Sequence, residues 1–108
     1  MPKTKIVYKS ELPFPFAKAV RSGDFVFVSG QIPFGPDGTI VQGTIEVQTR
    51  VVLEAIAKTL AEAGCTMADV VKNTIWLEDP PARATVRSDL MLDAKIEIET
   101  LAYKPLDD

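Results

Sequence analysis

The residues of this chain that can carry acid–base chemistry are few and of restricted types. The sequence contains no histidine and one cysteine, Cys65, so the usual histidine and cysteine ligand sets for zinc, haem and iron–sulfur clusters cannot be assembled. We therefore expect no catalytic metal. Because histidine is the commonest general base, proton transfer must instead depend on carboxylates, lysine, tyrosine, backbone groups or the substrate. The candidate residues are thus chiefly glutamates and aspartates.

Two segments late in the chain combine such carboxylates with arginine. Alternation along residues 82–88 places Arg83, Thr85 and Arg87 on one face of an extended segment, and Glu97 lies on the polar face of the last predicted strand. The planar guanidinium of arginine binds a carboxylate through two parallel hydrogen bonds that lysine cannot reproduce. A glutamate whose pKa is raised by partial burial is suited to accept a proton from water. From the residues alone, cross-strand ion pairs on a solvated sheet face are the simpler interpretation of these charges.

Hydrophobic periodicity predicts the strands that must position these side chains. Residues 25–28 (Phe-Val-Phe-Val) follow a turn cluster at residues 22–24 and are apolar on both faces, which predicts a central strand covered on each side. Residues 94–103 alternate between small or apolar residues on one face and mostly charged residues on the other. The predicted strands are residues 3–9, 17–21, 25–32, 70–78, a segment beginning near residue 82, and 94–103.

A change of period predicts one helix over residues 44–63. Thr44 is suited to be its N-cap, and Gly64 suits the left-handed position that follows many helices. A sheet with this helix on one side makes the fold class α/β (α+β), in a single domain spanning residues 1–108. The side chains that recur every four residues, and are expected to face the sheet, are Gln48, Val52, Ile56 and Leu60.

Composition and charge exclude several classes of partner. Twelve basic and fifteen acidic residues give a net charge of −3, without the basic patch that supplies most nucleic-acid affinity, so we expect no nucleic-acid partner. The apolar runs are too short to span a bilayer and the start lacks the apolar region of a secretory signal, so we expect no membrane contact and a cytoplasmic location. A domain of 108 residues buries only a modest core, which makes stabilisation by self-association plausible.

Four short motifs occur in order along the chain: residues 28–33 (VSGQIP), 63–72 (AGCTMADVVK), 81–83 (PAR) and 95–99 (KIEIE). Any one of them is weak evidence, but the ordered set spans most of the sequence. Together they resemble the Rid family of reactive-intermediate deaminases. The resemblance implies a chorismate-mutase-like fold, in which a sheet is backed by two helices and three subunits pack through their sheets as a homotrimer.

The resemblance also implies an activity and a role for five residues. Members similar to this chain hydrolyse enamine or imine intermediates, such as 2-aminoacrylate and 2-iminopropanoate, to 2-keto acids and ammonia without a cofactor. Arg83 matches the arginine that binds the substrate carboxylate, and Glu97 matches the glutamate that positions the water. The resemblance places the backbone of Thr85 near the ligand, and the N–H of Gly30 can approach it closely. Phe16 stands where such deaminases often have a tyrosine, so it can form a pocket wall but offers no hydroxyl.

Alternatives to this interpretation remain open. A non-catalytic trimer that binds small carboxylate metabolites is the main one, and a single-strand ribonuclease has little support in an acidic chain without histidine. Gly30 can simply mark a β-bulge, and Phe16 can belong to the core. Cys65 is interpreted as structural, and Lys72 as a charge at a strand edge.

One departure from the family pattern concerns the middle of the chain. Similar members carry a second helix between the strand that matches residues 70–78 and the Pro-Ala-Arg strand, whereas here Asp79, Pro80 and Pro81 join them directly. Parallel neighbouring strands need a crossover of about a dozen residues or more, so a connection this short should exclude them. We therefore expect either a missing segment near residues 79–81 or a deleted variant whose second half pairs differently.

Overall fold

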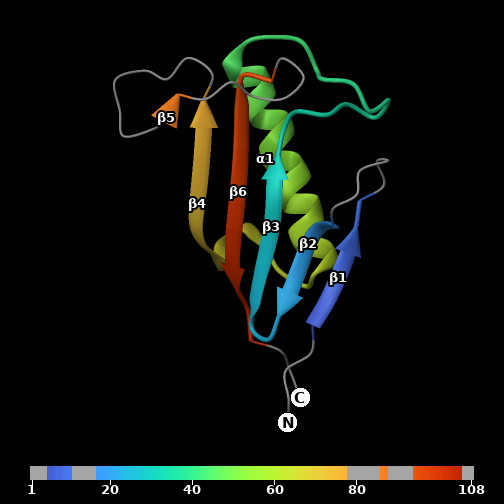
Figure 1. Cartoon of the computed structure of the whole chain (residues 1–108), viewed down its shortest axis with the longest axis vertical. Helices are drawn as coiled ribbons and strands as arrows, with labels where there is room; N and C mark the ends of the chain where they lie inside the picture. Colours follow the sequence, from blue (N-terminus) through green and yellow to red (C-terminus); the bar gives the residue numbers. More distant parts are fainter. Residues whose placement is uncertain (1–4, 11–16, 78–85, 88–93, 106–108) are drawn as a thin grey trace.

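The structure of the chain, a computed structural model, describes residues 5–10, 17–77, 86–87 and 94–105. Six strands form one sheet in the order β1-β2-β3-β6-β4-β5, and helix α1 packs against one face of it (Figure 1). The predicted α+β class, with a helix on one side of the sheet, is therefore confirmed. The elements are β1 (Lys5–Lys9), β2 (Ala17–Ser22), β3 (Phe25–Gln31), α1 (Ile45–Glu62), the 3₁₀ helix η1 (Met67–Asp69), β4 (Val70–Leu77), β5 (Val86–Arg87) and β6 (Ile96–Tyr103).

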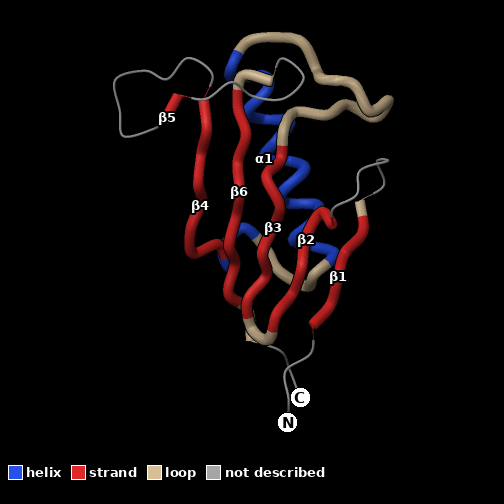
Figure 2. The backbone as a smooth tube through the Cα atoms, in the orientation of Figure 1, coloured by secondary structure: helices blue, strands red, loops and turns tan. Residues whose placement is uncertain are grey.

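The centre of the sheet consists of antiparallel neighbours. β2 and β3 form the predicted hairpin, and in its turn Gly23 has φ 61°, a left-handed value that favours glycine. β6 is the last strand in the sequence, but it lies between β3 and β4 (Figure 2). It is antiparallel to both of them. The strand that carries Glu97 is therefore held on both sides, by a strand from each half of the chain.

Helix α1 forms where the four-residue period predicts it. The backbone N–H of Val47 donates a hydrogen bond to Oγ1 of the N-cap Thr44 at 3.3 Å, and Gly64, after the C-cap residue, has φ 79°. Both predicted ends are confirmed. Within the described ranges, no helix combines the length and the apolar character that crossing a membrane requires. The residues that α1 buries are Gln48, Val52, Ile56, Thr59 and Leu60.

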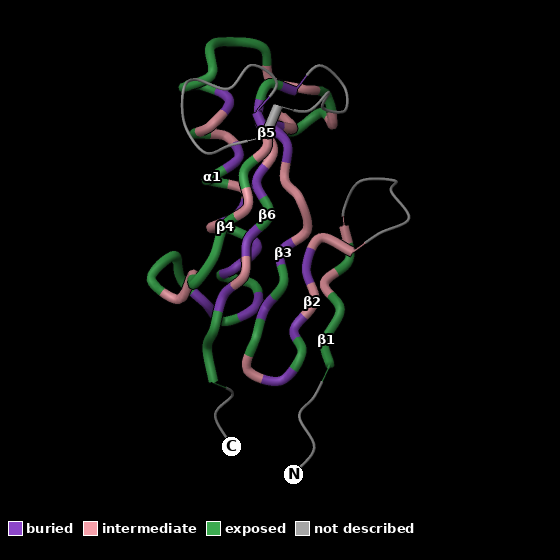
Figure 3. The backbone as a smooth tube through the Cα atoms, turned by 60° about the vertical axis from the view of Figure 1, so that its left-hand side comes forward, coloured by how far each residue is buried: buried purple, intermediate pink, exposed green. Residues whose placement is uncertain are grey.

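The core lies between α1 and the sheet face that α1 covers. Val26 and Val28 of β3 and Ile96 and Ile98 of β6 are at most 4% exposed. Because alternate residues of a strand point to opposite faces, buried and exposed positions alternate along β6 (Figure 3). Full burial of each such aliphatic side chain contributes about 1.5–3 kcal/mol, so this face supplies most of the stability of a single chain.

A buried arginine joins the sheet to the end of the helix. Arg21 of β2 is 2% exposed, and its guanidinium donates hydrogen bonds to the carbonyl oxygens of Gly23 (3.0 Å), Lys104 (2.9 Å) and Ala63 (3.0 Å). Its positive charge thus lies at the negative end of α1. Cys65 is also buried, and desolvation raises the pKa of its thiol, which agrees with the structural role expected for it.

The face of the sheet opposite α1 is open in the single chain. Phe25 is 42% exposed, Phe27 is 50% exposed and Tyr103 is 43% exposed. The rings of Phe25 and Tyr103 contact each other across β3 and β6, with centroids 5.1 Å apart. The prediction that the Phe-Val-Phe-Val strand is covered on both sides is therefore wrong for the chain alone. The strand is central, but α1 covers only its valines.

The short strand β5 corrects the prediction about parallel pairing. β5 is parallel to β4, with Trp76 opposite Val86 and Leu77 opposite Arg87, and the strand expected from residue 82 is described only at Val86–Arg87. The prediction that so short a connection excludes a parallel pair is therefore wrong. Because β5 pairs only with the last two residues of β4, the chain need not return along the whole length of that strand. Residues 79–81, where a missing segment was expected, lie outside the described residues.

Candidate functional site

The structure brings together two of the five predicted site residues. Gly30 lies near the end of β3 and Glu97 near the start of β6, and these strands are neighbours. Phe16, Arg83 and Thr85 lie outside the described residues, so their predicted roles stay predictions. The geometry of the site is accordingly that of the Gly30–Glu97 pair and its surroundings.

Gly30 lies in a bulge and against the carboxyl group of Glu97. The register between β3 and β6 shifts between Val28 and Gln31, so the interpretation of Gly30 as a bulge residue is correct. A Cβ at Gly30 would overlap Oε2 of Glu97 and lie 3.0 Å from its Cδ. The left-handed φ angles of this chain occur at other glycines, so space for the carboxyl group, not backbone conformation, requires glycine here.

Glu97 occupies a half-buried position on the open face of the sheet. It is opposite Trp76 in the β4–β6 pair, and Gly30 lies on its other side. Desolvation by these surroundings raises the pKa of Glu97, and the negative charge of Glu99, the next residue on the same face, raises it further. A carboxylate with a raised pKa binds a proton more readily than an ordinary surface glutamate, which is the property that a general base at neutral pH requires.

A buried amide fixes the start of the strand that carries Glu97. Gln48 of α1 is fully buried; its Nε2 donates to the carbonyl oxygen of Val41 at 3.1 Å, and its Oε1 accepts from the backbone N–H of Lys95 at 2.8 Å. These bonds connect the helix to the residue just before β6. The sequence placed Gln48 in the core stripe of α1, but periodicity alone could not identify this bond to Lys95.

A groove of about 350 Å³ lies along the open face, beside Glu99 of β6. Lys72 and Thr74 of β4 lie on one side of it and Ser29 of β3 on the other, with Glu99 of β6 between them. Lys72 was interpreted as a strand-edge charge, and the structure shows that it also lines this groove. Because alternate side chains of a strand point to the same face, the sequence could have shown that Lys72, Thr74 and Trp76 share one face of β4. Apolar residues that line the groove include Val20, Phe27 and Leu101.

This groove combines charged and polar groups with apolar ones. Lys72 offers a positive charge and Ser29 and Thr74 offer hydroxyls, while the carboxyl group of Glu99 lies between them. Oγ of Ser29 already donates to the carbonyl oxygen of Ala17 at 2.6 Å, so it is oriented by the chain itself. Among the residues that the structure describes, no group of three or more cysteine, aspartate and glutamate side chains is placed to hold a metal ion.

Comparisons with known proteins agree on one family. The family described as Endoribonuclease L-PSP matches residues 10–88. A RutC family protein of Pyrococcus abyssi is 41% identical over 110 positions, which cover 83% of this chain and 87% of the relative. A mitochondrial protein of Saccharomyces cerevisiae is 30% identical, over 82% of this chain and 74% of its own. A crystal structure from Yersinia pestis, described as a protein of unknown function of the conserved Rid protein family, superposes with a TM-score of 0.79 and 32% identity, over 93% of this chain and 99% of that one.

The alignment with the Pyrococcus relative also shows that this chain is shorter over the matched region. The alignment has 110 positions, but 83% of a 108-residue chain is fewer residues than that. The alignment therefore contains gaps in this chain. The expected place of these gaps near residues 79–81 stays a prediction. The family match, the sequence identities and the shared fold together show that the chain belongs to the Rid family, also described as Endoribonuclease L-PSP.

Proposed function

We propose that this chain hydrolyses small enamine or imine intermediates derived from 2-amino acids, such as 2-aminoacrylate and 2-iminopropanoate, to 2-keto acids and ammonia. The observation that carries the proposal is the half-buried carboxyl group of Glu97, whose pKa is raised and which lies against Gly30 on the open face of the sheet. Membership of the Rid family supports an imine-related activity.

In the proposed reaction, Glu97 moves protons and the other groups hold the substrate. Glu97 accepts a proton from water as the water oxygen bonds to the imine carbon, and passes it to the imine nitrogen to give a tetrahedral aminoalcohol. It then carries the hydroxyl proton to the amino nitrogen, the carbon–nitrogen bond breaks, and ammonia and the 2-keto acid leave. The reaction consumes one water and requires neither an oxidant nor a cofactor.

The remaining predicted residues complete this proposal. Arg83 binds the substrate carboxylate through the two parallel hydrogen bonds that a guanidinium offers. The backbone N–H of Gly30 and the backbone of Thr85 approach the ligand, and Phe16 forms an apolar wall in place of a tyrosine. Gly30 is adjacent to Glu97 in the structure, which supports its part of the proposal.

We further propose that the chain acts as a homotrimer whose subunits cover one another's open sheet faces. The exposed rings of Phe25, Phe27 and Tyr103 on that face support this, since apolar side chains gathered on one surface commonly mark an interface. Light scattering should give the mass of three chains or of a multiple of three. A mass of one chain at every concentration would contradict both the trimer and an active cleft between subunits.

The direct test of the activity is ammonia release from freshly generated 2-iminopropanoate. Glu97→Gln keeps the shape of the side chain but cannot accept the proton, so we expect turnover to fall by roughly a hundredfold or more while carboxylate ligands still bind. If the unaltered protein binds such ligands but releases no ammonia above the uncatalysed rate, the alternative of a non-catalytic carboxylate binder replaces the enzyme.

The family is described as Endoribonuclease L-PSP, so RNA cleavage is a second activity that must be tested. A net charge of −3 and the absence of histidine from the sequence give little support to RNA binding and cleavage. We therefore expect no cleavage of single-stranded RNA under the conditions of the imine assay.

The expected cytoplasmic location of this chain can be tested by cell fractionation. The test is needed because the S. cerevisiae relative is mitochondrial by name.

A further inference from the structure

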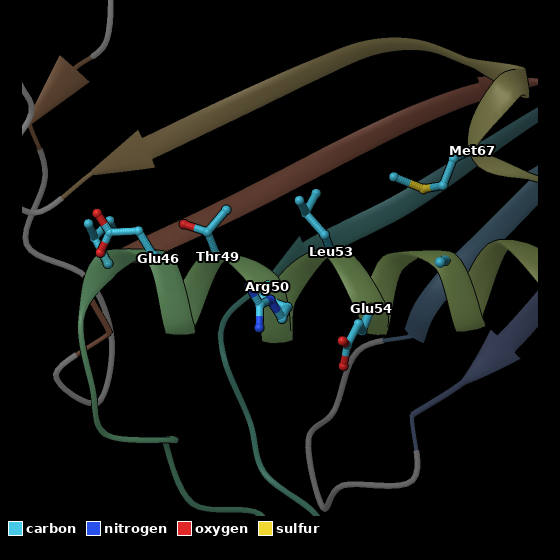
Figure 4. A pocket seen from close by; sticks show the side chains of 8 residues that line it. Glu46, Thr49, Arg50, Leu53, Glu54 and Met67 are labelled. Atoms are coloured by element: carbon cyan, nitrogen blue, oxygen red, sulfur yellow. The ribbon is translucent and has the colours of Figure 1, made fainter.

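A second groove, of about 570 Å³, lies beside α1 on the helix side of the sheet (Figure 4). Ile45, Thr49, Leu53 and Ala57 of α1 line it, and Met67 of η1 closes one end. Figure 4 shows Leu53 and Met67 extending towards the space between α1 and β4. The groove is therefore mainly apolar, and it lies on the opposite face of the sheet from the groove that Lys72 lines.

The groove exists because α1 covers only part of the sheet. α1 packs on β3 and β6, and β4 extends beyond it. Ile75 of β4 is opposite Ile98 of β6, so both point to the helix side, yet Ile98 is 3% exposed and Ile75 is 40% exposed. One side of α1 and the adjoining face of β4 thus form an apolar surface. In the described part of the chain, no element covers this surface.

Charged residues run along α1 beside the apolar row. Glu46, Arg50, Glu54 and Lys58 follow one another at four-residue spacing, so they form a row in which the sign alternates. Glu46, Arg50 and Glu54 border the groove, and Figure 4 shows Arg50 and Glu54 on the outer side of the helix. Whatever packs against the apolar row must therefore face this alternating pattern.

We propose that the occupant of this groove is a second copy of the chain, whose α1 packs antiparallel against α1 about a two-fold axis near Val52. The row of charges is centred on Val52, so this arrangement places Arg50 opposite Glu54 of the partner subunit and Glu46 opposite Lys58 of the partner subunit, each pair occurring twice. A parallel arrangement would place identical charges opposite one another. The charge pattern is therefore complementary to itself in one orientation only.

The apolar row fits the same arrangement. Its residues, from Ile45 to Ala57, are centred within one residue of Val52, so the axis that pairs the charges also superposes the two apolar rows. Helices pack with their axes about 8–10 Å apart, which is close enough for Leu53 and Ala57 to contact the partner helix and for the charges to pair at the border. A two-fold contact of this kind is self-complementary and closed, unlike a contact that could extend into a filament.

This contact is independent of the proposed trimer, because it uses the opposite face of the sheet. Paired through α1, a chain that is otherwise monomeric becomes a dimer, and a trimer becomes a hexamer. In either case the mass doubles. The activity proposed above does not depend on this contact, so a failed test of the helix contact leaves the deaminase proposal unchanged.

Sedimentation of matched variants tests the inference. Leu53→Ser removes an apolar side chain from the groove, whereas Val47→Ser removes one of similar exposure (43% against 39%) from a residue of α1 that does not line the groove. We expect Leu53→Ser to sediment with half the mass of the unaltered protein over the micromolar range, and Val47→Ser with the full mass. Equal masses for both variants and the unaltered protein would overturn the proposal.

A charge exchange tests the orientation of the two helices. Arg50→Glu places like charges opposite each other twice in the antiparallel pair, and should raise the dissociation constant by about ten- to hundredfold. The double variant R50E/E54R exchanges the partners and should restore the original mass. Circular dichroism must show equal helix content in each variant. Loss of association in the single variant without rescue in the double variant would overturn the antiparallel pairing.

Discussion

The two faces of the sheet differ in what their side chains do. On the face covered by α1, Val26, Ile96 and Ile98 are almost completely buried. On the other face the same strands present Phe25 and Phe27, half exposed, together with Glu97. The first face therefore stabilises the single chain, and the second retains the groups that can bind a substrate or another subunit.

This difference indicates on which face so small a domain can carry an ionisable side chain. A carboxyl group on the covered face would have to be buried without a partner, at a cost of several kcal/mol. On the open face the cost is smaller, since Glu97 is only half buried and its environment raises its pKa instead of excluding the group. Changes on the two faces should consequently alter different properties, stability on one and activity or assembly on the other.

The largest expected effect is on the covered face. Ile56 is 1% exposed, and Ile56→Ala should lower the free energy of unfolding by about 2–5 kcal/mol, because it removes buried methyl groups and leaves a cavity. Phe27→Ser on the open face should cost a dilute single chain less than about 1 kcal/mol, since Phe27 is already 50% exposed. Urea denaturation at several protein concentrations measures both. Equal losses at every concentration would remove the distinction between the faces.

The next effect concerns the predicted substrate clamp. Arg83→Ala and Arg83→Lys should both lower kcat/KM for 2-iminopropanoate by roughly a hundredfold, or about 2–3 kcal/mol, because lysine keeps the charge but not the paired hydrogen bonds. Unfolding measurements serve as the control and should change little. If Arg83→Ala binds carboxylates and deaminates imines as well as the unaltered protein, the interpretation of Arg83 as part of a solvated ion pair is correct.

A smaller effect is expected at the glycine beside the carboxyl group. In Gly30→Ala the new Cβ would overlap the position of the Glu97 carboxyl group, which must move away, so kcat should fall about tenfold or more. Gly35→Ala is the matched control, since a Cβ there would meet Val41 at 3.3 Å and not Glu97. Equal activity of the two variants would show that the position of the Glu97 carboxyl group is not important for the reaction.

The sequence predicted most of the fold because periodicity and turn residues determine it locally. The four-residue period predicted α1, and Thr44 and Gly64 predicted its ends. The exposure of Phe25 and Phe27 was not predicted, because a residue that another subunit can cover has the same apolar character as one in the core. The place of β5 was also missed, since its two-residue pairing with β4 leaves no recognisable pattern.

The site was predicted less completely than the fold. The alternation of residues 94–103 placed Glu97 on the polar face, and this is confirmed. Gly30 suggested a bulge in β3, but the spacing of residues could not show that this bulge brings Gly30 against the carboxyl group of Glu97. The place of Lys72 in the groove depends on β4 being next to β6, a long-range pairing that local pattern does not determine.

The smallest expected effect concerns the stability cost of Glu97. Because its pKa is raised in the folded chain, the unfolded chain ionises first as the pH rises, and stability falls until the pH exceeds the folded pKa. Below the ordinary value of 4.5 both states are protonated and no cost exists. Glu97→Gln should therefore raise the free energy of unfolding at neutral pH by less than about 1 kcal/mol, since solvent screens this partly exposed charge, with no gain in acid.

Glu62→Gln is the matched control, because it removes a carboxylate that pairs with a cation, so its effect on stability at neutral pH should have the opposite sign. Glu62 pairs with Lys18 at 2.6 Å, so removing its charge should lower stability slightly at neutral pH. Denaturant unfolding of both variants between acid and neutral pH measures the difference. A gain from Glu97→Gln that persists in acid would show that the glutamate costs stability through packing and not through its charge. In that case the desolvated carboxylate, on which the proposed general base depends, would lose its physical basis.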